Sequence, residues 1–401
     1  MKSHCIWLGK ILFSLLILSP LPLFLLIDDS LQNHSPTEKA PYVHWGGLDP
    51  HSEIYISWET EHPTGSYIQY GPDVENLEFS YNNISETFLH HGKLLSLAAD
   101  TRYYYQIVDT EGHPQSVVQT FKTAPLPGTS FNITLIADTQ QAMGIGHYET
   151  TAKSLANLQD TDFVIDAGDI CQVPDDQKTW DYFFQLSAKY TSKFPLITVP
   201  GNHDGDDVNG LYTDYFTQSH PNGRYYAFNW SNVQFVMAEI ADGGDVPKGV
   251  PSNDAHYAWL NETLEQGLAQ DYRVLVLHRS VLFSIGEDED LKKNLIPVIE
   301  KYNVSLVIYG HTHCYERFYF QNHTYLCLGG GAGLQNSIMR TSEYSQIQAL
   351  GPFYSQLEFS PSGIVLTTVS SLGDIIDRVE FLKEGSQLIP LVSESGPNGG
   401  M

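Results

Sequence analysis

The sequence predicts an α/β protein with a buried parallel sheet, preceded by a small all-β sandwich. The main observation is a set of five short apolar runs, each of which leads to a residue able to bind a divalent metal. Buried parallel strands have such continuous apolar runs, and open α/β sheets place their ligands beyond the carboxyl ends of the strands. We therefore expect one sheet edge to gather the ligating side chains, which are Asp138, Asp169, Asn202, His278, His311 and His313.

The sandwich is expected over residues 41–125. Short β-type segments such as 54–58 and 103–108 are separated by turn residues, without helical stretches between them. Strands at this spacing favour a small sandwich, with Trp58 as its expected core residue. The proline-rich segment 123–129 is the expected hinge to the second domain.

The second domain is expected over residues 130–383, where strands alternate with helical stretches. The intervals from Asp138 to Asp169 and from Asp169 to Asn202 are 31 and 33 residues. Each interval matches one strand–helix–strand unit, which needs roughly 30 residues or more. Residues 384–401 are the expected disordered tail.

The first 30 residues predict export. Two lysines precede an apolar run over residues 11–27, and two aspartates follow it. This charge asymmetry indicates that the rest of the chain becomes extracellular or lumenal. A signal peptide and a membrane anchor both stay open, because the run is short for a span and contains two prolines. Residues 31–40 are an expected polar linker.

Glycosylation and the cysteines fit an exported protein. Seven Asn-x-Ser/Thr sequons favour a secreted glycoprotein, although some of them arise by chance. Outside the export segment three cysteines remain, an odd number that does not form a disulfide framework. Two of them lie beside candidate ligands, so a bridge or a metal contact stays open, with small buried side chains as the alternative.

The net charge of −26, from 47 acidic and 21 basic residues, excludes a basic face for nucleic acid. An anionic substrate would also be repelled. A site for one must therefore be made positive locally, most simply by metal ions.

Taken singly, the candidate ligands have ordinary alternatives. Asp138 suits a helix cap, Asp169 a turn and His278 a buried core position. Their coincidence at five strand ends favours a metal site instead. Two imidazoles at i and i+2, His311 and His313, can reach two different metals. Carboxylates, imidazoles and an amide suit two divalent ions such as Fe, Zn or Mn.

The ordered blocks resemble the calcineurin-like metallophosphoesterases. The five blocks are Asp138, Gly168-Asp169, Gly201-Asn202-His203-Asp204, His278 and Gly310-His311-Thr312-His313. Segments 275–280 and 310–317 are more closely similar to purple acid phosphatases, and segments 97–105 and 121–125 resemble their fibronectin-like domain. The resemblance implies a four-layer α/β/β/α core after a fibronectin III-like sandwich.

The resemblance also implies roles at the metals. Asp169 would bridge both metals, and the second metal would take Asn202, His278 and His311. The first metal would take Asp138 and His313.

Three further residues would act on the substrate. His203 would serve as general acid or phosphate contact, with Asp204 orienting it, and Asn202 would also touch the substrate. Arg279 is a weaker candidate for phosphate contact, since a surface charge is its alternative.

The implied activity is that of an exported, acid phosphatase-like phosphomonoesterase, in which a metal-bound hydroxide attacks phosphorus. The substrate would be a phosphorylated small molecule. A phosphodiesterase on the same core and a non-catalytic member that binds phosphate or a partner are the alternatives. The sequence sets no oligomeric state.

Two positions depart from the family pattern. Purple members have a Tyr three residues after the bridging Asp, where this chain has Gln172. Non-purple relatives have a His two residues after the first Asp, where this chain has Gln140. Both glutamines are tentative ligands or neighbours of ligands, and the first site is expected to favour a divalent ion over ferric iron.

We therefore predict that the metal-loaded protein has no tyrosinate colour. The measurement is its visible absorption spectrum. An intense band that disappears when a tyrosine is substituted would contradict the prediction.

Overall fold

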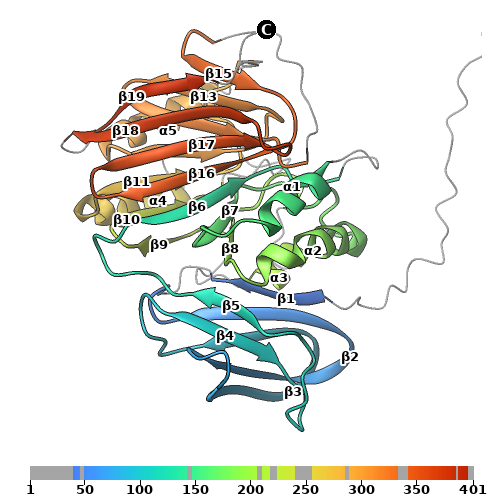
Figure 1. The fold of residues 1–401 in the computed structure, drawn as a ribbon. Coiled ribbons are helices and arrows are strands. Elements are labelled where there is room, and N and C mark those ends of the chain that lie inside the picture. The colour runs from blue at the N-terminus through green and yellow to red at the C-terminus, as the bar shows by residue number, and fades with distance from the viewer. Residues whose placement is uncertain are drawn as a thin grey trace, which may run out of the picture. The chain divides into compact units, whose positions relative to one another are not determined.

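The structure is a computed structural model of the chain and describes residues 39–45, 49–141, 147–205, 210–216, 224–239, 255–284, 289–332, 342–384 and 387–395 (Figure 1). The expected export segment and most of the expected linker lie outside these residues. Among the described residues, no helix combines the length and the apolarity needed to cross a membrane.

The described residues form two sheets, and the first of them has twelve strands. Its carboxyl-terminal part has three parallel strands at its centre, β6 (Phe131–Ile136), β7 (Phe163–Asp166) and β8 (Leu196–Thr198). Antiparallel strands extend it beyond β6, namely β16 (Phe353–Ser360), β17 (Gly363–Ser370), β18 (Ile375–Glu384) and β19 (Gln387–Ser395).

The second sheet has the order β15-β13-β14-β12-β11-β10-β9. Strands β10, β11, β12 and β14 are parallel neighbours, and the outer pairs are antiparallel. The bounds are β9 (Tyr226–Trp230), β10 (Val233–Met237), β11 (Tyr272–Val276), β12 (Leu306–Tyr309), β13 (Tyr315–Phe320), β14 (His323–Leu328) and β15 (Ser345–Ala349).

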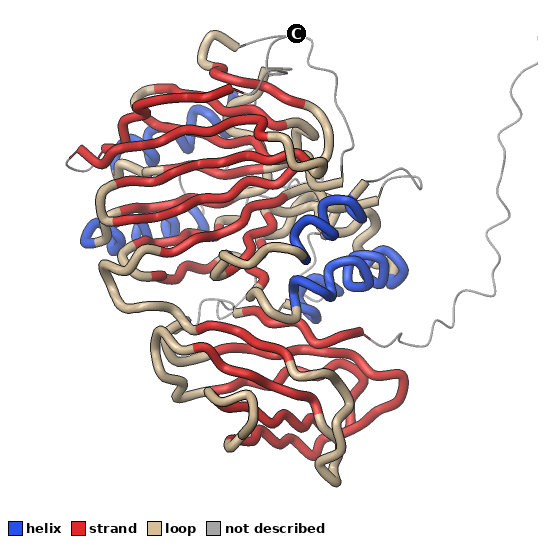
Figure 2. The backbone as a smooth tube through the Cα atoms, in the orientation of Figure 1, coloured by secondary structure: helices blue, strands red, loops and turns tan. Residues whose placement is uncertain are grey.

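The two sheets pack face to face, and helices cover their outer faces (Figure 2). Alternate residues of β6 and β7, such as Phe131 and Phe163, enter the apolar core between the sheets with Phe235 of β10. Helices α1 (Tyr148–Ala156), α2 (Gln177–Thr191) and α3 (Leu211–Tyr215) cover the first sheet, and α4 (Ala255–Gln266) and α5 (Glu289–Lys301) the second. A short 3-10 helix, Gly267–Ala269, follows α4. The predicted α/β/β/α layering is confirmed.

The amino-terminal part is all-β, as expected, and Trp58 is buried in it. Its strands are β1 (Lys39–His44), β2 (Ile54–Gly71), β3 (Phe79–Leu94), β4 (Arg102–Ile107) and β5 (Gln119–Lys122).

These strands are not separate from the core sheet. Strand β1 pairs with β2 and also, through His44 and Leu196, with β8. Trp45, directly after β1, stacks on Trp230 of β9 with ring centroids 5.2 Å apart. The two predicted domains therefore share one hydrogen-bonded sheet and part of one core.

Three boundaries differ from the sequence expectations. Residues 39 and 40 of the expected linker belong to β1, because the buried Lys39 amine pairs with Glu59 and Asp181. The expected hinge at 123–129 is not the only join, since the Tyr105 hydroxyl donates to the carbonyl of Ser192 at 2.7 Å. The expected disordered tail is wrong over residues 387–395, which form β19 because they complete the edge of β18.

A buried ion pair connects the two sheets. Arg317 on β13 donates to the carboxylate of Asp377 on β18, with Nε 2.7 Å and Nη2 3.3 Å from its oxygens. The Tyr315 hydroxyl donates to the same carboxylate at 2.6 Å, and Asp377 is fully buried. Strand β13 follows directly after the loop that carries His311 and His313. The Arg317–Asp377 ion pair therefore holds the strand to which this loop is attached.

We predict that Arg317→Ala lowers the free energy of unfolding by about 3 kcal/mol, because it leaves the Asp377 charge buried without its partner. The measurement is urea denaturation of the full chain. Arg378→Ala on β18 is the matched control: it removes a partly exposed pair with Glu380 and should cost less than about 1 kcal/mol. Equal losses in the two variants would contradict the prediction.

Candidate metal centre

The first two candidate ligands lie directly beyond neighbouring parallel strands. Asp138 follows β6 and Asp169 follows β7, and the Asp138 N–H donates to the carbonyl of Gly168 at 2.9 Å. Both aspartates have a φ of 57° and His311 has a φ of 71°, in the left-handed region that L residues rarely adopt. Such strained positions gather at functional sites, where the surrounding structure holds them.

Two glycines make room for these carboxylates. A Cβ on Gly201 would overlap the carboxylate of Asp169, and one on Gly310 would overlap that of Asp138. The loops after β8 and β12 therefore approach the aspartates closely, which only glycine at positions 201 and 310 allows. The loop after β8 thereby brings the backbone N–H of His203 to Asp169, and the loop after β12 brings His311 and His313 beside Asp138.

Two groups of ligating side chains meet at these loops. Asp138, Asp169 and His313 form one, and Asp169, His278 and His311 form the other, with the ligand atoms of each group within 4.8 Å of one another. Asp169 is common to both. A carboxylate shared by two adjacent ligand groups is the arrangement that a two-metal site requires.

The distances between the ligand atoms fit divalent metal ions. His278 Nε2 lies 3.2 Å from Asp169 Oδ2, and His313 Nε2 lies 3.3 Å from Asp138 Oδ1. Asn202 Oδ1 and His311 Nδ1 are 2.9 Å apart. Two atoms bound to one metal at about 2.1 Å lie roughly 3 Å apart or slightly more.

His278 is also oriented for a metal. Its Nδ1 lies 2.8 Å from the carbonyl oxygen of Ala167, to which it donates a hydrogen bond. Its buried Nε2 faces the carboxylate of Asp169, the ligand shared by both groups. A carbonyl that fixes one ring nitrogen and leaves the other for the metal is a typical outer contact of a histidine ligand. The residues of both groups therefore fit a pair of divalent metals.

The charges at the centre are tightly coupled. Burial alone would raise the pKa of Asp169, but the adjacent His278 lowers it to about 2. Asp169 in turn raises the pKa of His278 to about 10, against the effect of burial. Without metal, a proton is therefore held on His278. Binding a cation must release this proton, so metal affinity increases with pH.

Asp204 has a different role from the one expected. Its carboxylate accepts hydrogen bonds from four backbone N–H groups, those of Asp169, Ile170, Cys171 and Gly201, at 2.7 to 3.0 Å. It therefore fixes the loops after β7 and β8. The expected orientation of His203 comes from Gln172 instead, because the Gln172 carbonyl oxygen lies 3.0 Å from His203 Nδ1.

Asp166, a fully buried carboxylate behind the centre, was not predicted from the sequence. The Thr139 hydroxyl donates to it at 3.2 Å, and so does the N–H of Gly168. Burial raises the pKa of Asp166 well above its usual range, and the charge of Asp204 adds to this effect. Asp166 is the last residue of β7, two residues before Gly168. A carboxylate at the end of an apolar run was the sequence signal that could have identified it.

The open side of the centre carries the remaining candidates. Asn202 is exposed, and His203 and Arg279 are half-buried. The terminal amide of Gln172 also faces His203 Nδ1, at 3.2 Å, and a rotation that exchanges its nitrogen and oxygen would let it accept from the same N–H. Arg279 is close enough to His311 for its charge to contribute to the lowered pKa of that imidazole, after burial and His278. Cys171, Cys314 and Cys327 are buried and unbridged.

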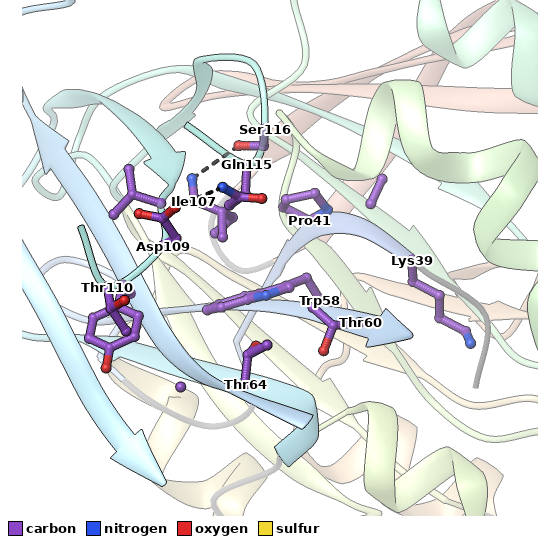
Figure 3. Close-up of a pocket in the computed structure, with 14 residues that line it drawn as sticks. Lys39, Pro41, Trp58, Thr60, Thr64, Ile107, Asp109, Thr110, Gln115 and Ser116 are labelled. Atoms are coloured by element: carbon purple, nitrogen blue, oxygen red, sulfur yellow. Dashed lines mark hydrogen bonds between the residues drawn. The ribbon is translucent and has the colours of Figure 1, made fainter. Parts of the chain in front are cut away.

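A cavity of about 250 Å³ lies elsewhere, in the amino-terminal part (Figure 3). Trp58, Tyr67, Ile107 and Asp109 are among the residues that line it, and none of the candidate ligands does. The two ligand groups therefore lie outside this cavity.

Two segments of the chain match families of known proteins. Residues 131–315 match the calcineurin-like phosphoesterases, and residues 39–123 match the amino-terminal domain of purple acid phosphatases. Both matched segments therefore resemble parts of the purple acid phosphatase-like metallophosphoesterases. This family has a dinuclear metal centre, and the two ligand groups that share Asp169 lie within the matched segment.

The curated relatives of this chain are distant. It is 26% identical to purple acid phosphatase 23 of Arabidopsis thaliana, over 63% of the chain and 64% of that protein. An uncharacterised protein of Mycobacterium tuberculosis is 24% identical over 68% of the chain and 60% of that protein. The chain spans 64%, 50% and 56% of purple acid phosphatases 23, 15 and 21 of Arabidopsis thaliana, less than two thirds of each.

Solved structures support the fold of the metallophosphoesterase. The purple acid phosphatase PPD1 from yellow lupin (Lupinus luteus) seeds has a TM-score of 0.71 at 19% identity, over 89% of this chain and 74% of that one. PhoD has a TM-score of 0.68 at 13% identity, over 92% and 94%.

We predict that removing metal with a chelator lowers the Tm of the full chain by several degrees. A ligand that binds only the folded state at 100 times its Kd stabilises that state by about 2.7 kcal/mol. Asp169→Asn should abolish the difference between loaded and chelated protein, whereas Asp374→Asn, at an exposed turn, should preserve it. The measurement is differential scanning calorimetry. A wild-type Tm that ignores the chelator would contradict the prediction.

Proposed function

We propose that this chain is an exported phosphoesterase that hydrolyses phosphate monoesters at a two-metal centre. The observation that carries the proposal is Asp169, shared between the two ligand groups. When bound, a metal pair would activate water, hold the anionic ester and neutralise charge on the leaving oxygen. It would also offset the repulsion of an anion by a chain of net charge −26.

The protein's own residues would hold and orient the ester. Asn202 is exposed beside His311, so its amide can contact both a metal and a phosphate oxygen. The half-buried Arg279 adds a fixed positive charge near His311, as a second contact for the phosphate. Together they would bind the ester on the solvent side of the ligand groups.

His203 would be the general acid for the leaving oxygen. The Gln172 carbonyl accepts the hydrogen bond of its Nδ1, which leaves Nε2 as the nitrogen that gives and takes a proton. The backbone N–H of His203 also donates to Asp169 Oδ1 at 2.8 Å, which fixes the residue directly beside the shared ligand. Asp204 would contribute by holding both loops in place.

Export is part of the same proposal. The apolar run with its flanking charges supports it. Three of the sequon asparagines, Asn83, Asn229 and Asn322, are exposed and could carry a glycan without disturbing the core. Whether the export segment is cleaved or anchors the protein is decided by determining the amino-terminal residue of the exported product.

We predict that the full chain, loaded with Mn, Zn or Fe, hydrolyses an aryl phosphate monoester faster than the matching aryl diester. The measurement is the release of the phenol from each substrate. A faster diester would favour the phosphodiesterase alternative. Turnover of neither substrate, with two metals bound, would favour the non-catalytic alternative that Gln140 and Gln172 motivate.

The same assay isolates the role of His203. A poor leaving group needs its proton and a nitrophenolate does not, so His203→Ala should lower kcat on an alkyl monoester by about 10²-fold or more, and much less on a nitrophenyl ester. His113→Ala, at an exposed position, should change neither. Equal losses on both esters would assign His203 to phosphate contact.

A further inference from the structure

A second cavity, of about 160 Å³, gathers three basic side chains far from the metal ligands. It lies between the β4–β5 pair and the two loops that lead into β7 and β8. Arg102, Lys122 and Lys193 line it, and Asp162 is the only acidic residue among its described lining residues. The cavity is at the amino ends of β7 and β8, whereas the metal ligands follow the carboxyl ends of these strands.

Two of the cations lie directly opposite each other. Arg102 on β4 and Lys122 on β5 are register partners of the antiparallel pair, so their side chains share one face. Like charges in this position destabilise a sheet. Lys122 is compensated, because its Nζ lies 3.1 Å from the carboxylate of Asp100 and 3.4 Å from that of Asp162. Both oxygens of Asp162 are used, since the second accepts the N–H of Asn132 at 3.0 Å.

Arg102 and Lys193 have no acidic partner in the part of the chain that the structure describes. The half-buried Lys193 ammonium donates to two main-chain carbonyls, those of Ala156 at 2.9 Å and Leu158 at 3.3 Å. Burial lowers the pKa of Lys193. An ammonium has three N–H donors, so one donor is left for a ligand. In a chain with 47 acidic and 21 basic residues, two unmatched cations at one cavity indicate that an anion completes the site.

The size and the donors of the cavity fit a tetrahedral oxyanion. A volume of about 160 Å³ is roughly five water volumes of about 30 Å³ each, and a phosphate ion has five heavy atoms. Guanidinium and ammonium groups form charge-assisted hydrogen bonds to phosphate oxygens. Lys193 alone would be an ordinary cation at the carboxyl end of helix α1, but Arg102 opposite Lys122 has no such structural role.

We propose that Arg102, Lys122 and Lys193 form a binding site for a phosphate ion or phosphoryl group, separate from the metal centre. The bound anion would offset the like charges of Arg102 and Lys122. The inference stands apart from the proposed function, because it needs neither a bound metal nor turnover. The product of a phosphomonoesterase is one source of such a group, and a larger phosphorylated molecule is the other.

The test is a calorimetric titration of the metal-loaded full chain with inorganic phosphate. We expect one bound phosphate per chain that persists in Asp169→Asn, which removes the shared metal ligand. Arg102→Gln should weaken this ion about 10-fold or more, because it removes a charged hydrogen-bond donor. Arg378→Gln on β18 removes the same charge elsewhere and should leave the affinity within about 2-fold.

The two sources are separated by titrating Asp169→Asn with an alkyl phosphate monoester. A site for the free ion binds the ester more weakly than phosphate, since the alkyl group has to fit as well. A site for a phosphoryl group of a larger molecule binds both equally.

A stability measurement separates binding from a structural role of Arg102. In phosphate-free buffer Arg102→Gln should not lower the Tm, because it removes a like charge opposite Lys122. Phosphate should raise the Tm of the wild type and of Arg378→Gln by the same amount, and that of Arg102→Gln by less. The control variant accounts for the general stabilisation of folded proteins by phosphate.

The outcomes also keep this inference apart from the proposed function. If Asp169→Asn binds no phosphate, or if Arg102→Gln binds it as the wild type does, the cavity is not a phosphate site, although the metal centre stands. If the chain binds no metal and Arg102 still determines phosphate affinity, the proposed function fails and the cavity site stands. Should Asp169→Asn not fold, the wild type freed of metal takes its place.

Discussion

The main physical constraint on the molecule is the burial of four carboxylates at the carboxyl ends of the strands. Asp138, Asp166, Asp169 and Asp204 are each at most 3% exposed, in a chain already far from electrical neutrality. Burying ionised groups is costly unless hydrogen bonds and opposite charges compensate. Backbone N–H groups compensate Asp204, and a proton on His278 compensates Asp169. A cation held by either ligand group would add further compensation for Asp138 and Asp169.

The parallel sheet explains why the ligands could be predicted from the sequence. Apolar runs of strand length identify the buried strands, and their carboxyl ends necessarily lie at one edge. Asp138 and Asp169 are therefore adjacent for a topological reason, and so are His278 and His311 on the other sheet. The α/β/β/α layering was predicted from the resemblance to a known family, which rests on the same residues. The strand ends and the family motifs thus predict the same ligands.

The remaining features depend on contacts that no local pattern encodes. The four amides around Asp204 come from two loops, so the sequence could not distinguish a carboxylate that orders loops from one that orients His203. The contact of His203 with Gln172 involves a main-chain oxygen, which every residue has. The segment that forms β19 was expected to be disordered. Its strand conformation depends on pairing with β18, which the composition of the segment does not reveal.

Strand β1 has a consequence for where the molecule can be divided. It covers the outer edge of the three-residue strand β8, directly before the loop that carries Asn202, and its neighbour Trp45 fills the core against Trp230. A fragment starting at Phe131 would leave that edge unpaired and open an apolar hole. Bare edges of this kind invite chains to aggregate. The amino-terminal strands are thus an obligatory cover for the two-sheet core, and a chain truncated at Phe131 would not be a stable unit.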